Sequence, residues 1–348
     1  MTVGTYTLTE EDIGTDVSRD FSVVASWEAA LPDVSPSPNI DQHIGTMFAD
    51  SDFTEDNTQF SNHGEEFMGN TILRAAPGQE WSGKNGEVGK VRWRPAAGSI
   101  NALSILSGGT NVGVELYGIE FDGTDETGSP NAGLVFSAAA LVNISRCSFH
   151  HNPQGYGFSF NTSALGRQRM TLCLFNNNSL DGMRRLQDNL SRGMQFEYCG
   201  FYKNDGFGAR GSAASSSVNF EFRHCWFVTN GSGSWEDAGG NGITGWCSTT
   251  DALATPAAQV MIGMLENQTE AGMLFVDAPG GDFKIQAGST LLEKGQPRNV
   301  TMLSKLSPTT EDVTGAALVF SSASSRYDIG PHQFSLAAVD ITSAPIIS

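Results

Sequence analysis

The chain has 348 residues, with 38 acidic and 20 basic side chains, so its formal net charge is −18. This acidic balance excludes the class of proteins that bind nucleic acid through clustered Lys and Arg. Forty glycines, together with a charged content of 17%, argue against long helices on the surface. Because 39% of the residues are hydrophobic, we expect a folded protein with a large buried core.

The first residues of the chain contrast with an export signal. They include Glu10, Glu11 and Asp12, and no basic residue precedes Arg19, whereas a signal peptide begins with a basic region followed by an apolar one. No apolar run in the sequence approaches the roughly 20 residues that cross a membrane as a helix. We therefore expect the protein to fold in the cytoplasm of its host cell, without a signal peptide and without a membrane partner.

Residues 1–65 are expected to form an N-terminal strand and a capping segment, ahead of the repeat that dominates the chain. In residues 20–31 the apolar Phe21, Val24 and Trp27 recur with helical spacing, and a proline ends the pattern. We expect this short amphipathic helix to cap the end of the repeat structure, because an open end would expose unpaired strands and core.

Four cysteines mark an internal repeat of 26 residues. Each is followed two residues later by a phenylalanine and three residues further on by an asparagine. A fifth copy lies 28 residues earlier, with Ile119 and Phe121 at the cysteine and phenylalanine positions and Thr124 at the asparagine position. The four complete copies contain Cys147, Phe149 and Asn152; Cys173, Phe175 and Asn178; Cys199, Phe201 and Asn204; and Cys225, Phe227 and Asn230.

Within each copy, apolar residues alternate on either side of a two-residue break, which is typical of short strands joined by a bend. A unit of this length without room for a helix cannot bury its own core, so the copies must stack as a solenoid. A crossover between parallel strands is almost always right-handed. We therefore predict an all-β fold, a right-handed parallel β-helix. The Cys and Phe columns should point inward, and the Asn column should lie at an inward corner where its amides bond to one another.

The 26-residue period breaks after Asn230. The next match to the repeat begins at Val260, so residues 231–255 are predicted to project as a lateral insertion. Trp235 and Trp246 lie in this insertion and are our candidate contacts for a partner protein or a glycan, because aromatic side chains on loops stack on sugars and anchor interfaces. Alternatively, both rings fold back as a lid over the flank of the solenoid.

The solenoid as a whole is expected to span residues 66–330. Residues 331–348 form an apolar C-terminal tail, which ends in Ala344, Pro345, Ile346 and Ile347 before the last serine. We expect this tail to dock on another protein or on a neighbouring subunit.

Segments at both ends of the predicted solenoid resemble right-handed parallel β-helix repeat proteins, the pectate-lyase-like solenoids. Residues 280–295, GGDFKIQAGSTLLEKG, resemble the signature of their last coil, and residues 326–330, RYDIG, resemble the terminal strand that follows it. Residues 71–84 resemble their first coil, and residues 21–30 resemble the capping helix of a subset that is common in bacteriophage genomes. The resemblance implies the fold and leaves the function open, because such proteins include polysaccharide lyases, hydrolases, tailspikes, adhesins and structural members.

An enzyme of this fold would cut polysaccharide, either with paired carboxylates or with calcium-binding carboxylates and a base. In the repeat frame Glu115 and Glu221 share one outward column, but Asn143, Arg169 and Gln195 separate them. We expect no two adjacent coils to bring carboxylates together in register. The sequence therefore predicts no catalytic residues.

Other groups that suggest chemistry have simpler interpretations. Arg184, Arg185 and Arg192 form the densest basic group, which we interpret as a surface salt-bridge patch on a turn. His150 and His151 fall where a turn begins and pair with no nucleophile, so we interpret them as ordinary turn histidines. The five cysteines form no CxxC pair and have no zinc-type spacing with the histidines, so we expect inert buried thiols, no metal site and no cofactor.

The missing export signal and the resemblance together suggest a bacteriophage virion protein, because such proteins fold in the host cytoplasm and leave by lysis. We expect a non-enzymatic structural protein on the exterior of the particle, such as a capsid decoration (cement) protein or a head fibre. Its expected partners are the major capsid protein or other virion proteins, and further copies of itself in a homotrimer, by analogy with other phage β-helices. The alternative is a tailspike or receptor-binding protein that binds or cleaves polysaccharide of the host surface.

Overall fold

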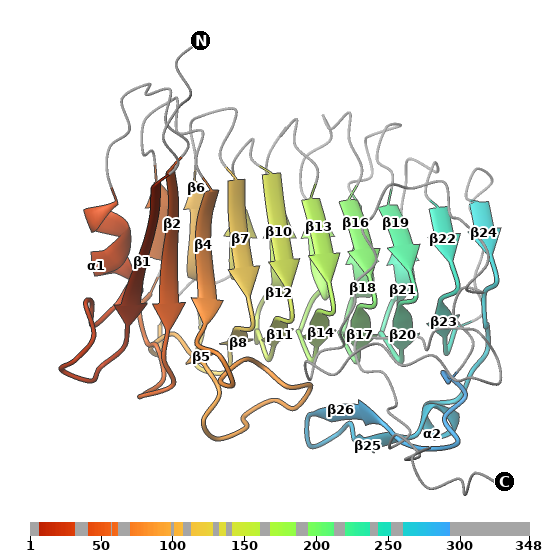
Figure 1. Ribbon diagram of the computed structural model, residues 1–348. Coiled ribbons are helices and arrows are strands. Elements are labelled where there is room, and N and C mark those ends of the chain that lie inside the picture. Colours follow the sequence, from red (N-terminus) through yellow and green to blue (C-terminus); the bar gives the residue numbers. More distant parts are fainter. Residues whose placement is uncertain are drawn as a thin grey trace, which may run out of the picture.

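Three parallel sheets form the long faces of a solenoid in the computed structural model (Figure 1). The structure describes residues 7–31, 41–56, 58–61, 70–98, 101–106, 113–127, 132–136, 141–160, 168–185, 194–211, 220–236, 243–251 and 260–292. The chain passes repeatedly through sheets A, B and C, and each pass places a new strand beside the strand of the preceding pass. The prediction of an all-β, parallel β-helix is confirmed.

Sheet A is the face with the long arrows at the front of Figure 1, and it has ten strands in the described part of the chain. All its neighbouring strands are parallel. In spatial order they are β1 (Thr7–Ile13), β2 (Asp41–Met47), β4 (Asn70–Ala75), β7 (Gly113–Tyr117), β10 (Leu141–Ser145), β13 (Gln168–Thr171), β16 (Met194–Glu197), β19 (Phe220–Arg223), β22 (Ile243–Gly245) and β24 (Val260–Ile262).

Sheets B and C each have seven parallel strands among the described residues. Sheet B contains β5 (Arg92–Trp93), β8 (Glu120–Asp122), β11 (Ser148–His150), β14 (Leu174–Asn176), β17 (Gly200–Tyr202), β20 (Trp226–Val228) and β23 (Ser248–Thr249). Sheet C contains β3 (Thr58–Ser61), β6 (Asn101–Leu106), β9 (Ala132–Phe136), β12 (Tyr156–Phe160), β15 (Met183–Arg185), β18 (Phe207–Arg210) and β21 (Gly233–Glu236).

The registers of the strands align equivalent residues of successive coils, as the repeat predicted. One inward column is a stack of rings whose centroids lie 4.9, 5.2, 5.0 and 4.7 Å apart, formed by Phe121, Phe149, Phe175, Phe201 and Phe227. A second inward column is fully buried and consists of Cys147, Cys173, Cys199, Cys225 and Cys247. Burial raises the pKa of the first four of these thiols, so they stay protonated and unreactive.

Two corners of the coil have a recurring construction. The corner between sheets A and B places one residue per coil in the left-handed backbone region, namely Gly118, Arg146, Leu172, Tyr198, His224, Trp246 and Gly263. The corner after sheet B holds a buried ladder of side-chain amides. Each amide donates to the side-chain oxygen of the next, at 2.6, 2.8 and 2.9 Å, through Asn152, Asn178, Asn204 and Asn230. The ladder gives partners to amides that are buried from water, which confirms the predicted inward corner.

Helix α1 (Val24–Ala30) lies at the N-terminal end of the solenoid, beside the first strands (Figure 1). Trp27 of this helix is fully buried, and its ring nitrogen donates to Glu11 Oε2 of β1 at 2.8 Å. Gly45 of β2 lies against the Trp27 ring and leaves no room for a larger side chain. The helix therefore caps the core, as predicted. Because β1 and β2 already pair in sheet A, the solenoid begins at β1 and not at residue 66, where we expected it.

The prediction of a lateral insertion at residues 231–255 is wrong. In the described part of this segment, β21, β22 and β23 continue sheets C, A and B as a further coil. The coil is shorter than its predecessors, since Cys247 follows Cys225 by 22 residues where the other steps are 26. A fixed period therefore missed it.

Both tryptophans of this coil are buried, so neither is a surface contact for a partner or a glycan. Trp235 is 9% exposed and packs inside the solenoid, with its ring centroid 5.6 Å from Phe222 and 5.0 Å from Phe227. Trp246 is 6% exposed and stacks beside His224 in the corner column. The two rings that we expected to be exposed anchors instead occupy a core position, for Trp235, and a corner position, for Trp246.

The chain leaves the solenoid after β24. Helix α2 (Glu270–Met273) is followed by an antiparallel hairpin of β25 (Phe275–Asp277) and β26 (Asp282–Ile285), which lies outside the solenoid beneath sheet B in Figure 1. We call residues 269–292 the C-terminal module. The expectation that residues 280–295 form a last coil is wrong for their described part. The predicted terminal strand at 326–330 and the tail at 331–348 lie outside the described residues.

Candidate functional site

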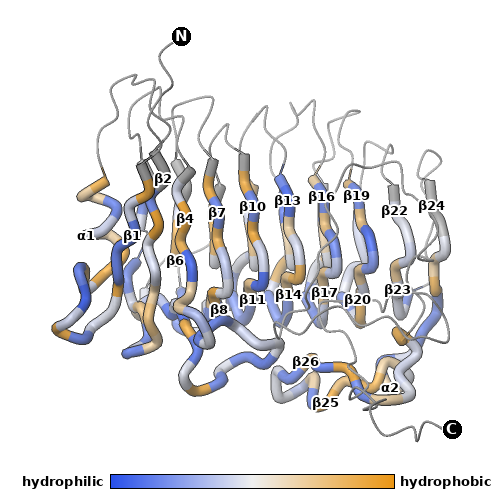
Figure 2. Tube along the Cα trace, viewed as in Figure 1, coloured by the Kyte–Doolittle hydropathy of each residue, from blue (hydrophilic) through white to orange (hydrophobic). Residues whose placement is uncertain are grey.

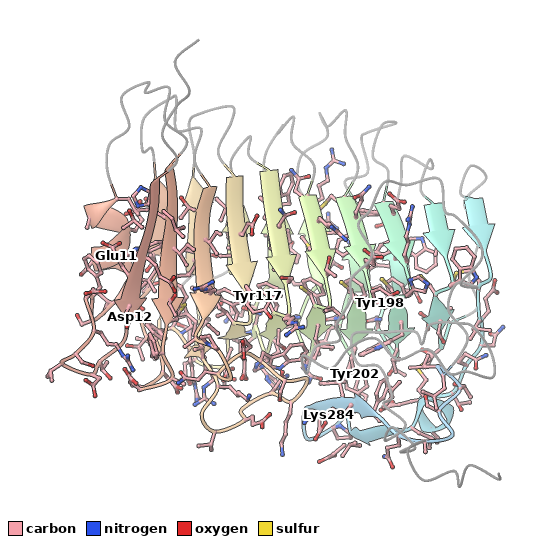
Figure 3. The ribbon with its side chains drawn as sticks, in the orientation of Figure 1. Glu11, Asp12, Tyr117, Tyr198, Tyr202 and Lys284 are labelled. Atoms are coloured by element: carbon pink, nitrogen blue, oxygen red, sulfur yellow. The ribbon has the colours of Figure 1, made fainter. Side chains whose placement is uncertain are left out.

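The C-terminal module covers one end of the outer face of sheet B. Trp226 of β20 is fully buried, with its ring centroid 4.9 Å from Phe275 and 6.0 Å from Phe283 of the module. Tyr202 of β17 lies edge-on to Phe283 at 5.0 Å, and Figure 3 shows it next to the module strand that carries Lys284. Figure 2 shows hydrophobic residues within the module, as this burial requires. The apolar side chains of the hairpin therefore find their partners on sheet B, which is why they do not form a last coil.

A second segment, residues 77–90, covers the middle of the same face, and Asn85 fixes it there. The Asn85 side-chain oxygen accepts from Ser148 Oγ at 2.8 Å and from Trp81 Nε1 at 3.1 Å. Its amide nitrogen donates to Asn176 Oδ1 at 3.2 Å. Its backbone N–H donates to the carbonyl of Gly281 in the C-terminal module at 3.0 Å, so the two covering segments are joined.

Two histidines and two carboxylates gather at the other end of this face. We name Glu120, Asp122, His150 and His151 the histidine–carboxylate cluster. Glu120 and Asp122 project outward from β8, and the strand register places His150 of β11 beside Asp122. His150 Nε2 lies 2.8 Å from Glu120 Oε1, while His150 Nδ1 lies 2.7 Å from His151 Nδ1 and 3.7 Å from Asp122 Oδ1. The His150 ring is thus held between two carboxylates on its own face of the sheet.

Burial and charge adjust the protonation of the cluster. Burial alone would raise the pKa of Asp122, but the charge of His150, the hydrogen bonds from Thr124 and the charge of Arg94 together lower it below its ordinary value. His151 is exposed, but the protein atoms around its ring partly desolvate it, which lowers its pKa; the neighbouring His150 lowers it further, so the neutral imidazole is favoured. The cluster therefore combines an ionised carboxylate with a neutral ring.

The loop over sheet B also holds Glu120. The backbone N–H of Gly86 donates to Glu120 Oε1 at 2.8 Å, and this carboxylate is 1% exposed. Its second oxygen, Oε2, is buried and has no hydrogen-bond partner among the described residues. Glu120 is therefore positioned by the covering segment and directed at His150.

Glu126 lies near the cluster, in the turn after β8, and its side chain is fully buried. Burial, and then the charges of Asp56 and Asp122, raise the pKa of Glu126 to about 8. In the described part of the chain neither of its carboxylate oxygens has a partner. Glu126 therefore holds its proton at neutral pH and adds no negative charge to the cluster.

We interpreted His150 and His151 as ordinary turn histidines. The structure places His151 directly after β11 with a left-handed backbone, but it places His150 inside β11, buried beside Glu120 and Asp122. The arrangement can pass a proton between His150 and Glu120, and it can also offer two imidazoles and a carboxylate to a metal ion. The signal was present in the repeat, since aligning Phe121 with Phe149 places Asp122 beside His150. Our search for paired carboxylates in adjacent coils did not find this contact, because the residue beside Asp122 is a histidine and not a second carboxylate.

The outer face of sheet A has the composition that the repeat frame predicted. The register aligns one outward column in the order Glu115, Asn143, Arg169, Gln195 and Glu221. Its side chains bond along the column, with Asn143 donating to Glu115 at 3.4 Å and Gln195 donating to Glu221 at 2.7 Å. Arg169 pairs with Glu197 of the neighbouring column at 2.9 Å. Among the described residues, this column contains no adjacent pair of carboxylates.

The basic group on sheet C is only partly a surface patch. Arg184 pairs with Asp181 at 3.3 Å, as predicted for a salt bridge. Arg185 is instead fully buried, and Arg192 lies outside the described residues.

Comparison with known proteins agrees with this architecture. Residues 91–253 match the family model described as "Right handed beta helix region". With its three parallel sheets, the protein is therefore an all-β solenoid, and it is a right-handed parallel β-helix repeat protein, as predicted.

The chain was also compared with solved structures and with curated sequences. The chain resembles the structure titled "Crystal structure of pectate lyase Pel9A" with 10% identity and a TM-score of 0.46, over 95% of this chain and 98% of that chain. No curated protein sequence matches the chain. In the described residues, no helix is long and apolar enough to cross a membrane.

Proposed function

We propose that this protein is a non-enzymatic structural component on the exterior of a bacteriophage particle, as a capsid decoration protein or a head fibre. The observation that carries the proposal is the pairing of polar side chains along the outer face of sheet A. Glu115 and Glu221 there accept hydrogen bonds from amides, and Glu197 accepts from an arginine, so these carboxylates are engaged by their neighbours in the sheet. We therefore interpret the outer face of sheet A as a solvated surface, because its column of outward residues does not present an opposed carboxylate pair to a sugar chain.

Two further features support an exterior role in a particle. The net charge of −18 favours a hydrated position away from packaged DNA, because like charges repel. Helix α1 (Val24–Ala30) closes the N-terminal end of the core, and residues 21–30, which contain it, resemble the capping helix common among bacteriophage β-helices. The partners implied by the proposal are the major capsid protein or other virion proteins, together with two further copies of this chain in a trimer.

Quantitative mass spectrometry of purified virions tests this function. The chain should be present at hundreds of copies per particle, and treatment of intact particles with a surface-labelling reagent should modify it. A chain that is absent from the particle, or present at a few copies on the tail alone, would overturn the assignment to the capsid exterior.

A second candidate function is the binding or cleavage of host surface polysaccharide by a tailspike or receptor-binding protein. The observation in its favour is the histidine–carboxylate cluster, in which His150 can accept a proton and return it through Glu120. Incubating the protein with host capsule or lipopolysaccharide and measuring the chain length of the glycan separates the two functions. Unchanged chain length supports the structural role. Release of oligosaccharide by the wild type and by Glu115→Gln on sheet A, but not by His150→Asn, would replace it.

A further inference from the structure

We propose that Asp122, His150 and His151 form a binding site for one divalent cation of the first transition series, with Zn²⁺ as its probe. Each of the three residues offers one donor atom, an imidazole nitrogen or a carboxylate oxygen, and these atoms lie within 4.8 Å of one another. His150 Nδ1 is the atom that faces both His151 Nδ1 and Asp122 Oδ1. The site joins two adjacent coils, because Asp122 belongs to β8 and His150 to β11. It is independent of the proposed structural role.

The separations between the donor atoms suit a small cation. His150 Nδ1 lies 3.7 Å from Asp122 Oδ1, close to the distance between two ligands that each stand about 2.0–2.2 Å from a tetrahedral zinc ion. The two Nδ1 atoms lie 2.7 Å apart, so in the metal-free protein His151 Nδ1 donates a hydrogen bond to His150 Nδ1. Metal binding requires His151 to carry its proton on Nε2 instead, and the two Nδ1 atoms to separate by a fraction of an ångström. His151 is exposed, so its ring is free to make this adjustment while His150 keeps its place.

Glu120 prepares His150 as a ligand. Glu120 Oε1 already accepts from the Gly86 N–H, so its 2.8 Å contact with His150 Nε2 fits a hydrogen bond that Nε2 donates, with the imidazole proton on Nε2. In the neutral ring, the lone pair then remains on Nδ1, the atom that faces Asp122 and His151. This carboxylate–histidine arrangement is the usual support of a metal-bound histidine. The N–H of Gly86 fixes Glu120 in turn at 2.8 Å.

The donor set selects the kind of metal. Imidazole nitrogens suit Zn²⁺ and its first-row neighbours, whereas Ca²⁺ and Mg²⁺ take sets of oxygen ligands. Glu120 and Asp122 face the site. Arg94 pairs with Asp125 at 2.8 Å and lies 3.9 Å from Asp122 Oδ2, whereas Asp122 Oδ1, which faces His150, accepts hydrogen bonds from Thr124 that a bound cation would have to replace. Three protein ligands leave one coordination position for water on the exposed side of His151.

Titration calorimetry of the untagged, full-length protein with Zn²⁺ tests the site, and the visible absorption of bound Co²⁺ reports its coordination. The first variant is His151→Asn, because asparagine tolerates the left-handed backbone of this position, where φ is 55°. The second is Glu120→Gln, which keeps the shape of the supporting residue and removes its charge. Glu115→Gln on sheet A is the matched control.

The wild type and Glu115→Gln should bind one Zn²⁺ per chain with the same affinity. Glu120→Gln should weaken binding about 10–100-fold, and His151→Asn should weaken it more, because it removes a direct ligand. Equal thermal unfolding of metal-free His151→Asn and wild type shows that the variant folds. The proposal is overturned if the wild type binds no Zn²⁺, if His151→Asn binds it as tightly as the wild type, or if Ca²⁺ competes for the site at equal concentration.

Discussion

The outer faces of sheets A and B are built by the same repeat, but the face of sheet A is open to solvent and the face of sheet B is covered by other segments of the chain. On sheet A the outward side chains of the column from Glu115 to Glu221 bond within the column or, for Arg169, to Glu197 of the next column, and they keep part of their surface in water. On sheet B the outward Leu174, Tyr202 and Trp226 are buried beneath residues 77–90 and the C-terminal module. The inward residues of both sheets share a single core, so the outward residues alone account for the difference. The repeat determines the fold, and the outward residues determine whether other segments cover each face.

The largest expected effect comes from opening the covered face. Trp226→Ala removes a fully buried ring that packs on Phe275 and Phe283, so the free energy of unfolding should fall by about 3–5 kcal/mol. Urea denaturation measures the loss, and limited proteolysis should cut the C-terminal module faster than in the wild type. An unchanged cleavage rate would show that the module is held by other contacts.

The corner between the two faces should make stability depend on pH. Burial, and then the charge of Arg223, lower the pKa of His224 from 6.5 to about 3. Between these values the unfolded chain binds a proton that the folded chain does not, so stability falls as the pH falls through this window. The contribution of His224 amounts to about 2 kcal/mol at pH 5 relative to neutral pH.

His224→Phe keeps a ring at this position, beside Tyr198, and removes the titrating group. The free energy of unfolding of the wild type should therefore drop more steeply between pH 7 and pH 5 than that of the variant. Equal slopes in the two proteins would contradict the depressed pKa.

A smaller effect is expected from the polar link between sheet B and its cover. The Tyr202 hydroxyl donates to Glu270 Oε1 of helix α2 at 2.6 Å. Tyr202→Phe keeps the buried ring and removes this one hydrogen bond to a charged group, so stability should fall by about 1.5 kcal/mol in urea denaturation. A loss as large as that of Trp226→Ala would mean that the polar link, and not the apolar contact, holds the module.

The smallest effect is expected on the open face. Asn143 is exposed, and it makes a 3.4 Å contact with Glu115 that water can replace. Asn143→Ala should therefore change the free energy of unfolding by less than about 0.5 kcal/mol. A larger loss of unfolding free energy would mean that the hydrogen bonds along the outer face of sheet A stabilise the solenoid.

Much of this fold could be predicted because its period is strict. The even spacing from Cys147 to Cys225 aligns each residue with its neighbours in the next coil, so the Cys, Phe and Asn columns and the capping helix follow from the sequence. The shortened coil that ends at Cys247 could not be found in the same way, because its loss of four residues shifts every later position. The C-terminal module could not be predicted for another reason. Its hairpin packs on the outer face of sheet B, against residues such as Tyr202 and Trp226 that are distant from it in the sequence.

The candidate site was only partly accessible from the sequence. The repeat frame contains the pairing of Asp122 with His150, since both follow equivalent phenylalanines. The contact between Glu120 and His150 is diagonal to the register, and it depends on burial by the loop that carries Gly86. Neither feature is encoded in the spacing of the repeat.

The asparagine ladder also bears on how this protein can change its size. Each step from Asn152 to Asn230 makes the same side-chain bond to the following coil, so these coils offer the same amide contact to their neighbours. Duplication or deletion of one 26-residue unit would preserve this ladder, whereas residues 77–90 and the C-terminal module, which are joined across sheet B, would have to shift with it. The solenoid would change in length by one strand spacing, about 4.8 Å. The length of the solenoid is therefore a dimension that duplication of a gene segment can change in equal steps.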